Sequence, residues 1–362
     1  MNRYGRFLLA CSCALLLVSC TGQSPTAAAS RVVAGVDFTA LFAPPSQGEI
    51  ETVLRDWESR KAPAQDFVEV AKATTYLGTG TATVRVVSHT VDGLKHYGLI
   101  IVPNGAAGHS LPVLVYTHGG EGGISVPEVL YIATVMNGTN AGRFVYVAPS
   151  FRSEPVDFYS REYVSAGPPS PWDRDVDDAL ALLEAALANT PAADPNRLGV
   201  LGVSRGACVA MLMAIRDPRL QLVVEFFGPT DFLGQFVQQV AEEALLGNPR
   251  DLPGLDYFNE TLLLPLQAGT LTLAEARLEL LRRSPVYFAR RLPPLQLHHG
   301  TEDTVVPVSE GERLREVLQG LARPAADFDF NFYPGGQHHP ATLPGSPERT
   351  QTFLARLLAG GV

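Results

Sequence analysis

Apolar and polar positions along the chain follow two periods, one typical of strands and one typical of helices. The runs that predict β-strands are 81–90, 94–103, 112–120, 143–150, 198–203, 220–227, 294–300 and 327–334. The segments that predict helices are 47–60, 173–189, 207–215, 309–321 and 347–358. The Asp-Gly pair at 92–93 predicts a hairpin between the first two strands. Because the later strands alternate with helices, we expect an α/β fold with a mostly parallel central sheet and helices on both faces.

Residues 231–292 interrupt this alternation. They contain several helical patterns and no strand pattern, and Thr272 and Glu275 have the spacing of a capping box. We therefore expect a helical insertion that covers a site on the sheet as a cap. Its many leucines are expected to pack inside the insertion.

The first residues have the features of a targeting segment. Arg3 and Arg6 precede an apolar stretch at 7–18 that is too short to span a bilayer as a mature helix. Ser19-Cys20 then resembles the end of a bacterial lipoprotein signal, which implies cleavage before Cys20 and acylation of that cysteine. The alternative is an ordinary secretory signal that is cut nearby. We expect an exported protein, anchored to a membrane of the cell envelope only through its N-terminal lipid.

Composition narrows the classes of function. Of the 362 residues, 46% are hydrophobic and 18% are charged, which is typical of a globular protein. The formal net charge is −9 without a basic block, so we expect no nucleic-acid partner. Cys208 is the one cysteine beyond Cys20, and its apolar neighbours predict a core position. No intramolecular disulfide is therefore expected in the mature chain.

One serine lies between glycines where a strand pattern gives way to a helix pattern. The stretch Gly202-Val203-Ser204-Arg205-Gly206 has the form of a nucleophile elbow, in which side chains flanking the serine would clash across a sharp turn. A plain strand–helix turn with an incidental serine is the alternative. We interpret Ser204 as a candidate nucleophile, which requires a base and an orienting acid.

Two later loops supply these groups, each directly after a predicted strand. Asp303 is the candidate acid, with Glu302 as its neighbour and competitor, and His338 is the candidate base. The carboxyl ends of parallel strands gather at one edge of a sheet, where α/β proteins place their sites. The order serine, aspartate, histidine is that of the α/β-hydrolase fold.

Glycines after an earlier strand offer further hydrogen-bond donors. In His118-Gly119-Gly120, the N–H of Gly119 or Gly120 could join the N–H of Arg205 in an oxyanion hole. A glycine-rich turn without this role is the alternative.

The sequence does not call for a metal or a cofactor. Adjacent histidines at 298–299 and 338–339 do not easily share one metal ion, and no nearby carboxylate or cysteine completes a site. The aspartates at 173, 175, 177 and 178 are interpreted as capping, solvated residues of a helix N-terminus.

Several stretches together resemble the catalytic domain of the prolyl oligopeptidase family, within the α/β-hydrolases. They are "HGG" at 118–120, "APSFRS" at 148–153, "DPNRLGVLGVSRGA" at 194–207, "HGTEDTVVP" at 299–307 and "YPGGQHHP" at 333–340. The resemblance runs from about residue 81 to the end. It implies a Ser-His-Asp triad of Ser204, His338 and Asp303, in preference to Glu302 and His339.

The chain also departs from that family's pattern. Fewer than 100 residues precede the matching region, too few for the family's β-propeller, and Glu121 follows "HGG" where many relatives have proline. The expected domains are a signal at 1–19, a flexible tether at 20–36, an N-terminal extension at 37–80 and a hydrolase domain at 81–362. We expect an esterase-like serine hydrolase for small esters. The alternatives are a peptidase for short peptides and a silent binding protein with the same fold.

Overall fold

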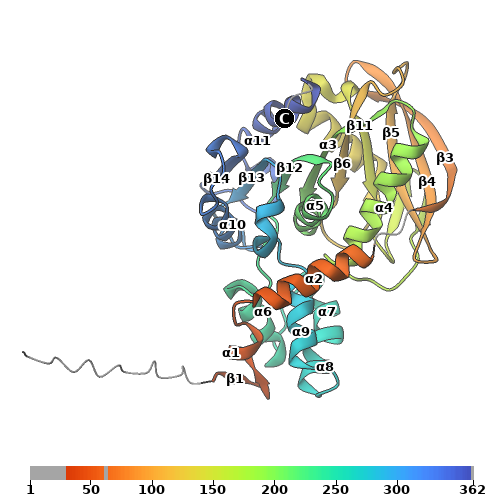
Figure 1. Cartoon of the computed structure of the whole chain (residues 1–362). Helices are drawn as coiled ribbons and strands as arrows, with labels where there is room; N and C mark the ends of the chain where they lie inside the picture. Colours follow the sequence, from red (N-terminus) through yellow and green to blue (C-terminus); the bar gives the residue numbers. More distant parts are fainter. Residues whose placement is uncertain (1–29, 61–63, 360–362) are drawn as a thin grey trace, which may run out of the picture.

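A nine-stranded sheet forms the centre of the computed structural model, which describes residues 30–60 and 64–359. Its strands are β3 (Gln65–Leu77), β4 (Gly80–Val91), β5 (Leu94–Pro103), β6 (Leu111–Thr117), β8 (Val145–Pro149), β11 (Ala193–Val203), β12 (Leu220–Phe226), β13 (Leu295–Gly300) and β14 (Phe328–Tyr333). Their order is β14-β13-β12-β11-β6-β8-β5-β4-β3, and Figure 1 shows the sheet with β14 at one end and β3 at the other. The pairs from β14 to β8 are parallel, and β8-β5, β5-β4 and β4-β3 are antiparallel. The expected mostly parallel sheet is thereby confirmed.

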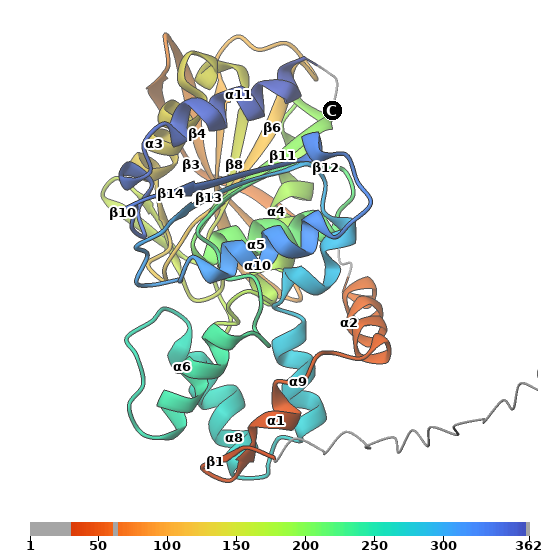
Figure 2. The ribbon, with the colours of Figure 1, turned by 90° about the vertical axis from the view of Figure 1, so that its left-hand side faces the viewer.

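Helices cover both faces of this sheet (Figure 2). On one face, α3 (Val126–Asn137) and α11 (Ser346–Leu358) bury apolar side chains against the strands. On the other face, α4 (Arg174–Asn189), α5 (Arg205–Arg216) and α10 (Ser309–Gln319) do the same. Cys208 of α5 is fully buried, as its apolar neighbours predict.

Smaller elements complete this part of the chain. The strands β7 (Ile124–Ser125), β9 (Pro155–Phe158) and β10 (Arg161–Val164) form a three-stranded sheet. Short 3₁₀ turns span Gly138–Arg143, Pro285–Arg291, Ala325–Asp327 and Pro340–Thr342. Among the described residues, no helix has both the length and the apolar character needed to cross a bilayer.

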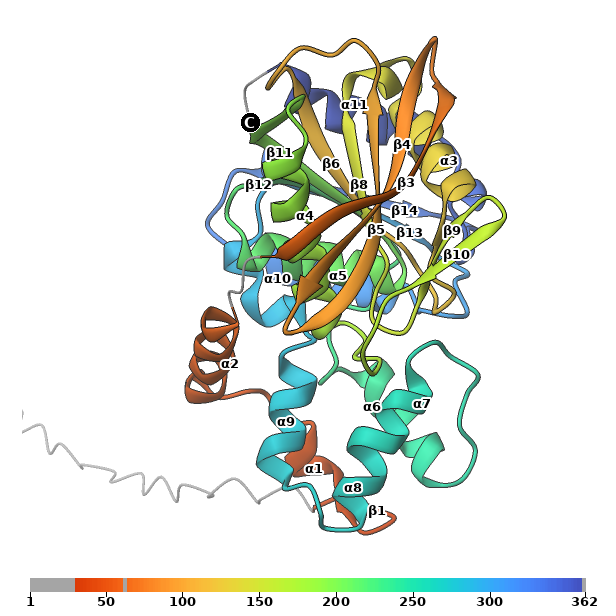
Figure 3. The ribbon, with the colours of Figure 1, turned by 90° about the vertical axis from the view of Figure 1, so that its right-hand side faces the viewer.

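The segment 231–292, called the cap below, is helical. It contains α6 (Gln235–Leu245), α7 (Leu255–Phe258), a π-helical turn at Asn259–Leu263, α8 (Leu264–Gln267) and α9 (Leu273–Leu281). Thr272 and Glu275 form the capping box of α9. Figure 3 shows the cap helices gathered at one end of the sheet. The cap connects β12 to β13, so it leaves the sheet at the carboxyl end of a parallel strand, the edge at which α/β sites form.

An N-terminal segment packs on the cap and corrects two expected boundaries. It contains β1 (Val32–Val33), β2 (Val36–Asp37), α1 (Phe38–Leu41) and α2 (Gln47–Ser59). The prediction that the flexible tether extends to residue 36 is wrong. β1 and β2 pair with each other, and they bury valines in the core that the cap also forms. The hydrolase domain expected from residue 81 begins earlier, because β3 is the edge strand of the main sheet. Most β3 side chains are at least partly exposed, as expected at an edge, so its apolar pattern is weak.

The acids at the start of α4 are not solvated capping residues, and that interpretation is wrong. All four are buried, and each pairs with an arginine: Asp173 with Arg60, Asp175 with Arg205, Asp177 with Arg216 and Asp178 with Arg152. A buried carboxylate is tolerated when a cation and hydrogen bonds compensate its lost hydration. The arginines that do so here lie far from these acids in the sequence, so the local pattern did not indicate the pairing.

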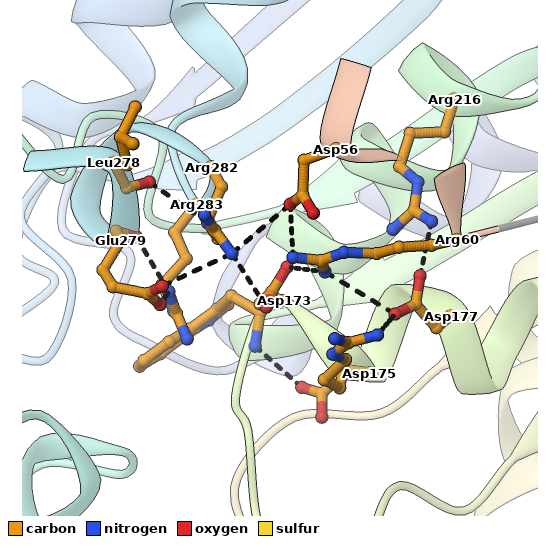
Figure 4. A network of polar contacts seen from close by, with 12 residues as sticks. Asp56, Arg60, Asp173, Asp175, Asp177, Arg216, Leu278, Glu279, Arg282 and Arg283 are labelled. Atoms are coloured by element: carbon orange, nitrogen blue, oxygen red, sulfur yellow. Dashed lines mark hydrogen bonds and ion pairs between the residues drawn. The ribbon is translucent and has the colours of Figure 1, made fainter. Parts of the chain in front are cut away.

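Part of this network joins three segments of the chain (Figure 4). The guanidinium of Arg60, directly after α2, lies 2.7 Å from the carboxylate of Asp173 and 2.5 Å from that of Asp56. Arg282, directly after α9, lies 3.4 Å from Asp56 and 3.9 Å from Asp173. The network thereby connects α2, the start of α4 and the end of the cap helix α9.

Candidate active site

Ser204 lies at a sharp turn between β11 and α5. Its φ of 56° and ψ of −121° are unusual for a residue with a side chain. The glycines on each side make the turn possible. A Cβ atom on Gly202 would lie 2.2 Å from the carbonyl oxygen of Gly206, and one on Gly206 would lie 2.0 Å from that of Thr117. Only glycine fits at these two positions, and the strand and helix therefore present the Ser204 side chain at the sheet edge.

The structure brings Ser204, His338 and Asp303 into one hydrogen-bonded line. Nε2 of His338 lies 2.8 Å from Oγ of Ser204, and Nδ1 of His338 lies 2.7 Å from Oδ2 of Asp303. Asp303 is buried, and its Oδ1 accepts hydrogen bonds from the N–H groups of Val305 and Val306, both at 2.9 Å. These donors hold the carboxylate in place, so its other oxygen can orient the imidazole ring.

The two competitors from the sequence lie outside this line. Glu302 is exposed, and its backbone N–H donates to the carbonyl of Gly336. His339 accepts a hydrogen bond at Nδ1 from the N–H of Ala341 and caps a 3₁₀ turn. The His338 ring instead packs on Phe227, with 4.3 Å between the ring centroids.

The glycines after β6 lie beside the serine. A Cβ atom on Gly119 would lie 3.1 Å from Cβ of Ser204, so the chain approaches the serine closely here. Gly120 has a φ of 66°, and its carbonyl accepts a hydrogen bond from the Arg205 guanidinium at 3.0 Å. The residues expected to form an oxyanion hole therefore lie next to Ser204, and a hydrogen bond connects Arg205 to Gly120.

The model of the prolyl oligopeptidase family matches residues 137–359, more than half of the chain. This chain belongs to the prolyl oligopeptidase family. Membership assigns it to the serine hydrolases, of the esterase or peptidase type.

Individual proteins similar to this family member match it at low sequence identity. A probable isoprenylcysteine alpha-carbonyl methylesterase from Arabidopsis thaliana is 27% identical over 177 residues, 47% of this chain. The match spans about a third of that relative, 33% of its length. Acetyl xylan esterase 1 from Thermoanaerobacterium sp. JW/SL YS485 has a TM-score of 0.59 at 19% identity, over 87% of this chain and 95% of that one. An acetyl xylan esterase from Paenibacillus sp. R4 has a TM-score of 0.59 at 17% identity, over 87% and 98%. These structural matches establish the α/β-hydrolase fold.

In this member of the prolyl oligopeptidase family, the Arg205 side chain is the centre of a buried ionic network. Its Nε and Nη2 atoms lie 2.8 Å and 2.9 Å from the two carboxylate oxygens of Asp175, and Nη1 lies 2.5 Å from Oε1 of Glu154. Its guanidinium also stacks over the ring of Phe151, 4.8 Å from the centroid. The sequence pattern around Ser204 predicts a role only for the backbone N–H of Arg205. The one signal in the sequence that could have indicated this network is an arginine at the start of a largely apolar helix.

Glu154 connects this network to the loop after β6. Its Oε2 lies 3.3 Å from Nε2 of His118, whose Nδ1 lies 3.1 Å from the Gly119 carbonyl. Burial lowers the pKa of His118 to about 3, so its ring is neutral. Burial also raises the pKa of Glu154 to about 7 in spite of its ion pair with Arg205. The network therefore contacts the Gly119–Gly120 loop from two sides, through Arg205 and through His118.

An apolar cavity opens at Ser204. Its walls come mainly from the cap, including Phe232, Val240 and Phe258, with Val305 and Val306 from the loop that holds Asp303. The N-terminal segment contributes Phe42. A cap over the site is expected from the sequence, but the lining of this space could not be predicted, because residues far apart in the chain form it.

Glu121 has a role that its sequence position did not reveal. Its Oε1 accepts a hydrogen bond from the backbone N–H of Gly254 in the cap. Gly254 has a φ of 81°, and a Cβ atom there would lie 2.4 Å from the Trp172 ring. The residue after "HGG" therefore ties the glycine loop to the cap directly beside the cavity.

The paired histidines at 298–299 are core residues. His298 hydrogen bonds through Nδ1 to the Tyr333 hydroxyl at 2.7 Å, and burial lowers its pKa to about 3. His299 hydrogen bonds through Nε2 to the Val306 carbonyl at 2.9 Å. Within residues 30–60 and 64–359, no group of three or more His, Cys, Asp or Glu side chains has the arrangement of a metal site. Cys20, the expected lipidation site, lies outside the described residues.

Proposed function

We propose that this chain is a carboxylic ester hydrolase in which Ser204, His338 and Asp303 form a catalytic triad. The observation that carries the proposal is the continuous line from Oγ of Ser204 through His338 to Asp303, with distances of 2.8 Å and 2.7 Å. A hydroxyl needs a base within this reach to become a nucleophile, and the base needs an orienting acid.

The reaction follows from this geometry. His338 accepts the hydroxyl proton as Oγ of Ser204 attacks the ester carbonyl carbon, and Asp303 stabilises the imidazolium that forms. The backbone N–H of Arg205, with that of Gly119 or Gly120, stabilises the negative oxygen of the tetrahedral intermediate. The intermediate collapses as His338 protonates the departing alcohol. Water, deprotonated by His338, then attacks the acyl-enzyme and releases the acid.

The lining of the cavity favours an ester over a peptide substrate. Arg205 is the one charged residue among the described residues that line it, and its guanidinium is engaged by Asp175 and Glu154. Recognition of a peptide amino terminus uses a carboxylate, and the described lining of the cavity contains none. The similarity to a methylesterase and to acetyl xylan esterases supports the same preference.

A fluorophosphonate probe and a pair of substrate sets test this function. We expect the probe to label the wild type and to leave Ser204→Ala unlabelled, because labelling requires the activated hydroxyl. Activated acyl esters should be cleaved with a higher kcat/KM than aminoacyl or peptidyl amides of the same acyl group. Equal labelling of both proteins would remove Ser204 from the mechanism, and preferential amide cleavage would identify a peptidase.

We also propose that the protein is exported and anchored to a bacterial cell-envelope membrane through lipidated Cys20. The basic start, the short apolar stretch at 7–18 and the Ser19-Cys20 pair support this assignment. Metabolic labelling with a radioactive fatty acid should mark the wild type and not Cys20→Ser. Secretion of an unlabelled wild-type protein would instead indicate an ordinary signal peptide.

A further inference from the structure

We propose that the cavity between Ser204 and the cap binds an apolar acyl chain of several carbons. The enzyme would then act on esters of medium-chain aliphatic acids with higher efficiency than on acetates. This inference rests on the proposed ester hydrolysis and defines its substrate class.

The composition of the cavity sets the chemistry of the group inside it. Apart from Ser204 and Arg205, its described lining consists of aliphatic and aromatic side chains, proline and glycine. Trp172, Phe232 and Phe258 pack on one another there, with ring centroids 5.0 to 5.7 Å apart. A sugar or a charged group would lose its hydration without finding partners in such a lining, whereas each buried methylene is stabilised.

The position of the cavity identifies the acyl side of the ester. The lining includes Ser204 and Arg205, whose Oγ and N–H meet the carbonyl group in the proposed mechanism. His338, which must protonate the departing alcohol, is not among the residues that line the cavity. The apolar cavity is therefore assigned to the acyl chain and not to the departing alcohol.

The cap provides most of the apolar wall and is held in place from two directions. Glu121 binds Gly254 from the glycine loop, and Arg277 in α9 binds the N-terminal segment that carries Phe42. In addition, Val305 and Val306 line the cavity, and their N–H groups hold Asp303. The acyl space is thus built as part of the catalytic centre, so its size should select the length of the acyl chain.

A series of p-nitrophenyl esters from acetate to decanoate tests the proposal, because the leaving group stays constant. We expect kcat/KM to rise about fourfold for each added methylene until the cavity is filled, and then to fall. A parallel series of alkyl acetates, in which the alcohol grows instead, should show a much smaller dependence on chain length.

Two neighbouring leucines of α9 provide a matched pair of variants. Leu280 lines the cavity and Leu281 does not, although both are buried to the same extent, with 1% of each side chain exposed. Leu280→Ala should move the preferred acyl length upward by one to two carbons, and Leu281→Ala should leave it unchanged. Ala241, which also lines the cavity, gives the opposite test, because Ala241→Leu should move the optimum downward.

The outcomes separate this inference from the function on which it rests. Ester hydrolysis that depends on Ser204 but is fastest with acetate would overturn the acyl-chain assignment and leave the esterase intact. The same holds if Leu280→Ala and Leu281→Ala shift the profile equally, or if selectivity follows the alcohol chain. Absence of hydrolysis with every ester, together with absence of probe labelling, would contradict the esterase itself.

Discussion

Nε2 of His338 lies 2.8 Å from Oγ of Ser204 although 134 residues separate them in the sequence. The two residues follow β14 and β11, which run parallel in one sheet with β12 and β13 between them. Parallel strands end at the same edge, so the loops after them meet. The cap leaves the sheet at this edge and covers the meeting point.

The choice of acid and base can be tested with adjacent residues as controls. We expect Asp303→Asn to lower kcat by about 10³- to 10⁴-fold, because the imidazole loses the group that sets its tautomer and stabilises its charge. Glu302→Gln, one residue away and exposed, should retain nearly full activity. Steady-state kinetics on an activated ester measure kcat of both variants. In the same comparison for the base, His338→Gln should lower kcat strongly and His339→Gln should not. If the neighbour's variant lost more kcat than the variant of the assigned residue in either pair, the catalytic role would belong to the neighbour.

The Arg205 side chain is expected to act as a positioning residue for the oxyanion hole. Arg205→Lys removes the two-point contact with Asp175 and the donor to the Gly120 carbonyl. We expect kcat to fall about 10- to 100-fold while KM changes little, because misplaced donors weaken only the transition state. Arg216→Lys at the other end of α5 also alters a buried ion pair, with Asp177, and serves as the control. If both variants lost stability and kcat in equal measure, the effect of Arg205 would be structural alone.

Glu225 should make the stability of the protein depend on pH. Burial raises the pKa of this fully buried carboxyl from 4.5 to about 8. The unfolded chain therefore releases its proton near pH 4.5 while the folded chain keeps it, so the free energy of unfolding decreases as pH rises toward 8. The loss is at most about 1.4 kcal/mol per pH unit. Glu225→Gln should remove the contribution of this carboxyl to the slope, so the variant should gain stability relative to the wild type from pH 5 to pH 8.

Thermal or urea unfolding across this range measures the difference. The exposed variant Glu302→Gln provides the control, because it should parallel the wild type at every pH. A constant offset between wild type and Glu225→Gln would show that the carboxyl does not change its charge on folding in this range.

Arg277 is expected to fasten the N-terminal segment to the cap. Its guanidinium donates to the carbonyls of Ala40, Leu41 and Ala43, at 2.7, 2.9 and 3.0 Å. It also hydrogen bonds to Glu49, which lowers the pKa of that carboxyl to about 2. This contribution is present above pH 4.5 and is lost as the pH falls toward 2.

We expect Arg277→Ala to leave these carbonyls unpaired and to speed proteolysis between residues 38 and 46 at neutral pH. Arg250→Ala changes another cap arginine, which pairs with Glu243 inside the cap, and should not expose this segment. Limited proteolysis followed by mass spectrometry locates the cuts. Equal protection of the segment in both variants would place its attachment elsewhere, in the buried apolar contacts of Phe38 and Leu41.

The sequence by itself determined the fold class and the candidate catalytic residues. Strand and helix periods follow from burial, so β11, α5 and the β4–β5 hairpin appear where their patterns predict them. The glycines around Ser204 are required by nearby backbone. A side chain on Gly202 would clash with the backbone of Gly206, and one on Gly206 would clash with that of Thr117 in the neighbouring strand. Asp303 and His338 could be proposed because each directly follows a predicted strand.

Only the tertiary structure decided what surrounds these residues. The edge strand β3 escaped prediction because an exposed edge does not require an apolar pattern. The acids of α4 looked solvated because their partners, such as Arg60 and Arg205, come from distant segments. The apolar cavity is formed by the cap, the N-terminal segment and two catalytic loops. Contacts between residues that are far apart in sequence leave no local period, so charge pairing and cavity shape emerge only when the chain is folded.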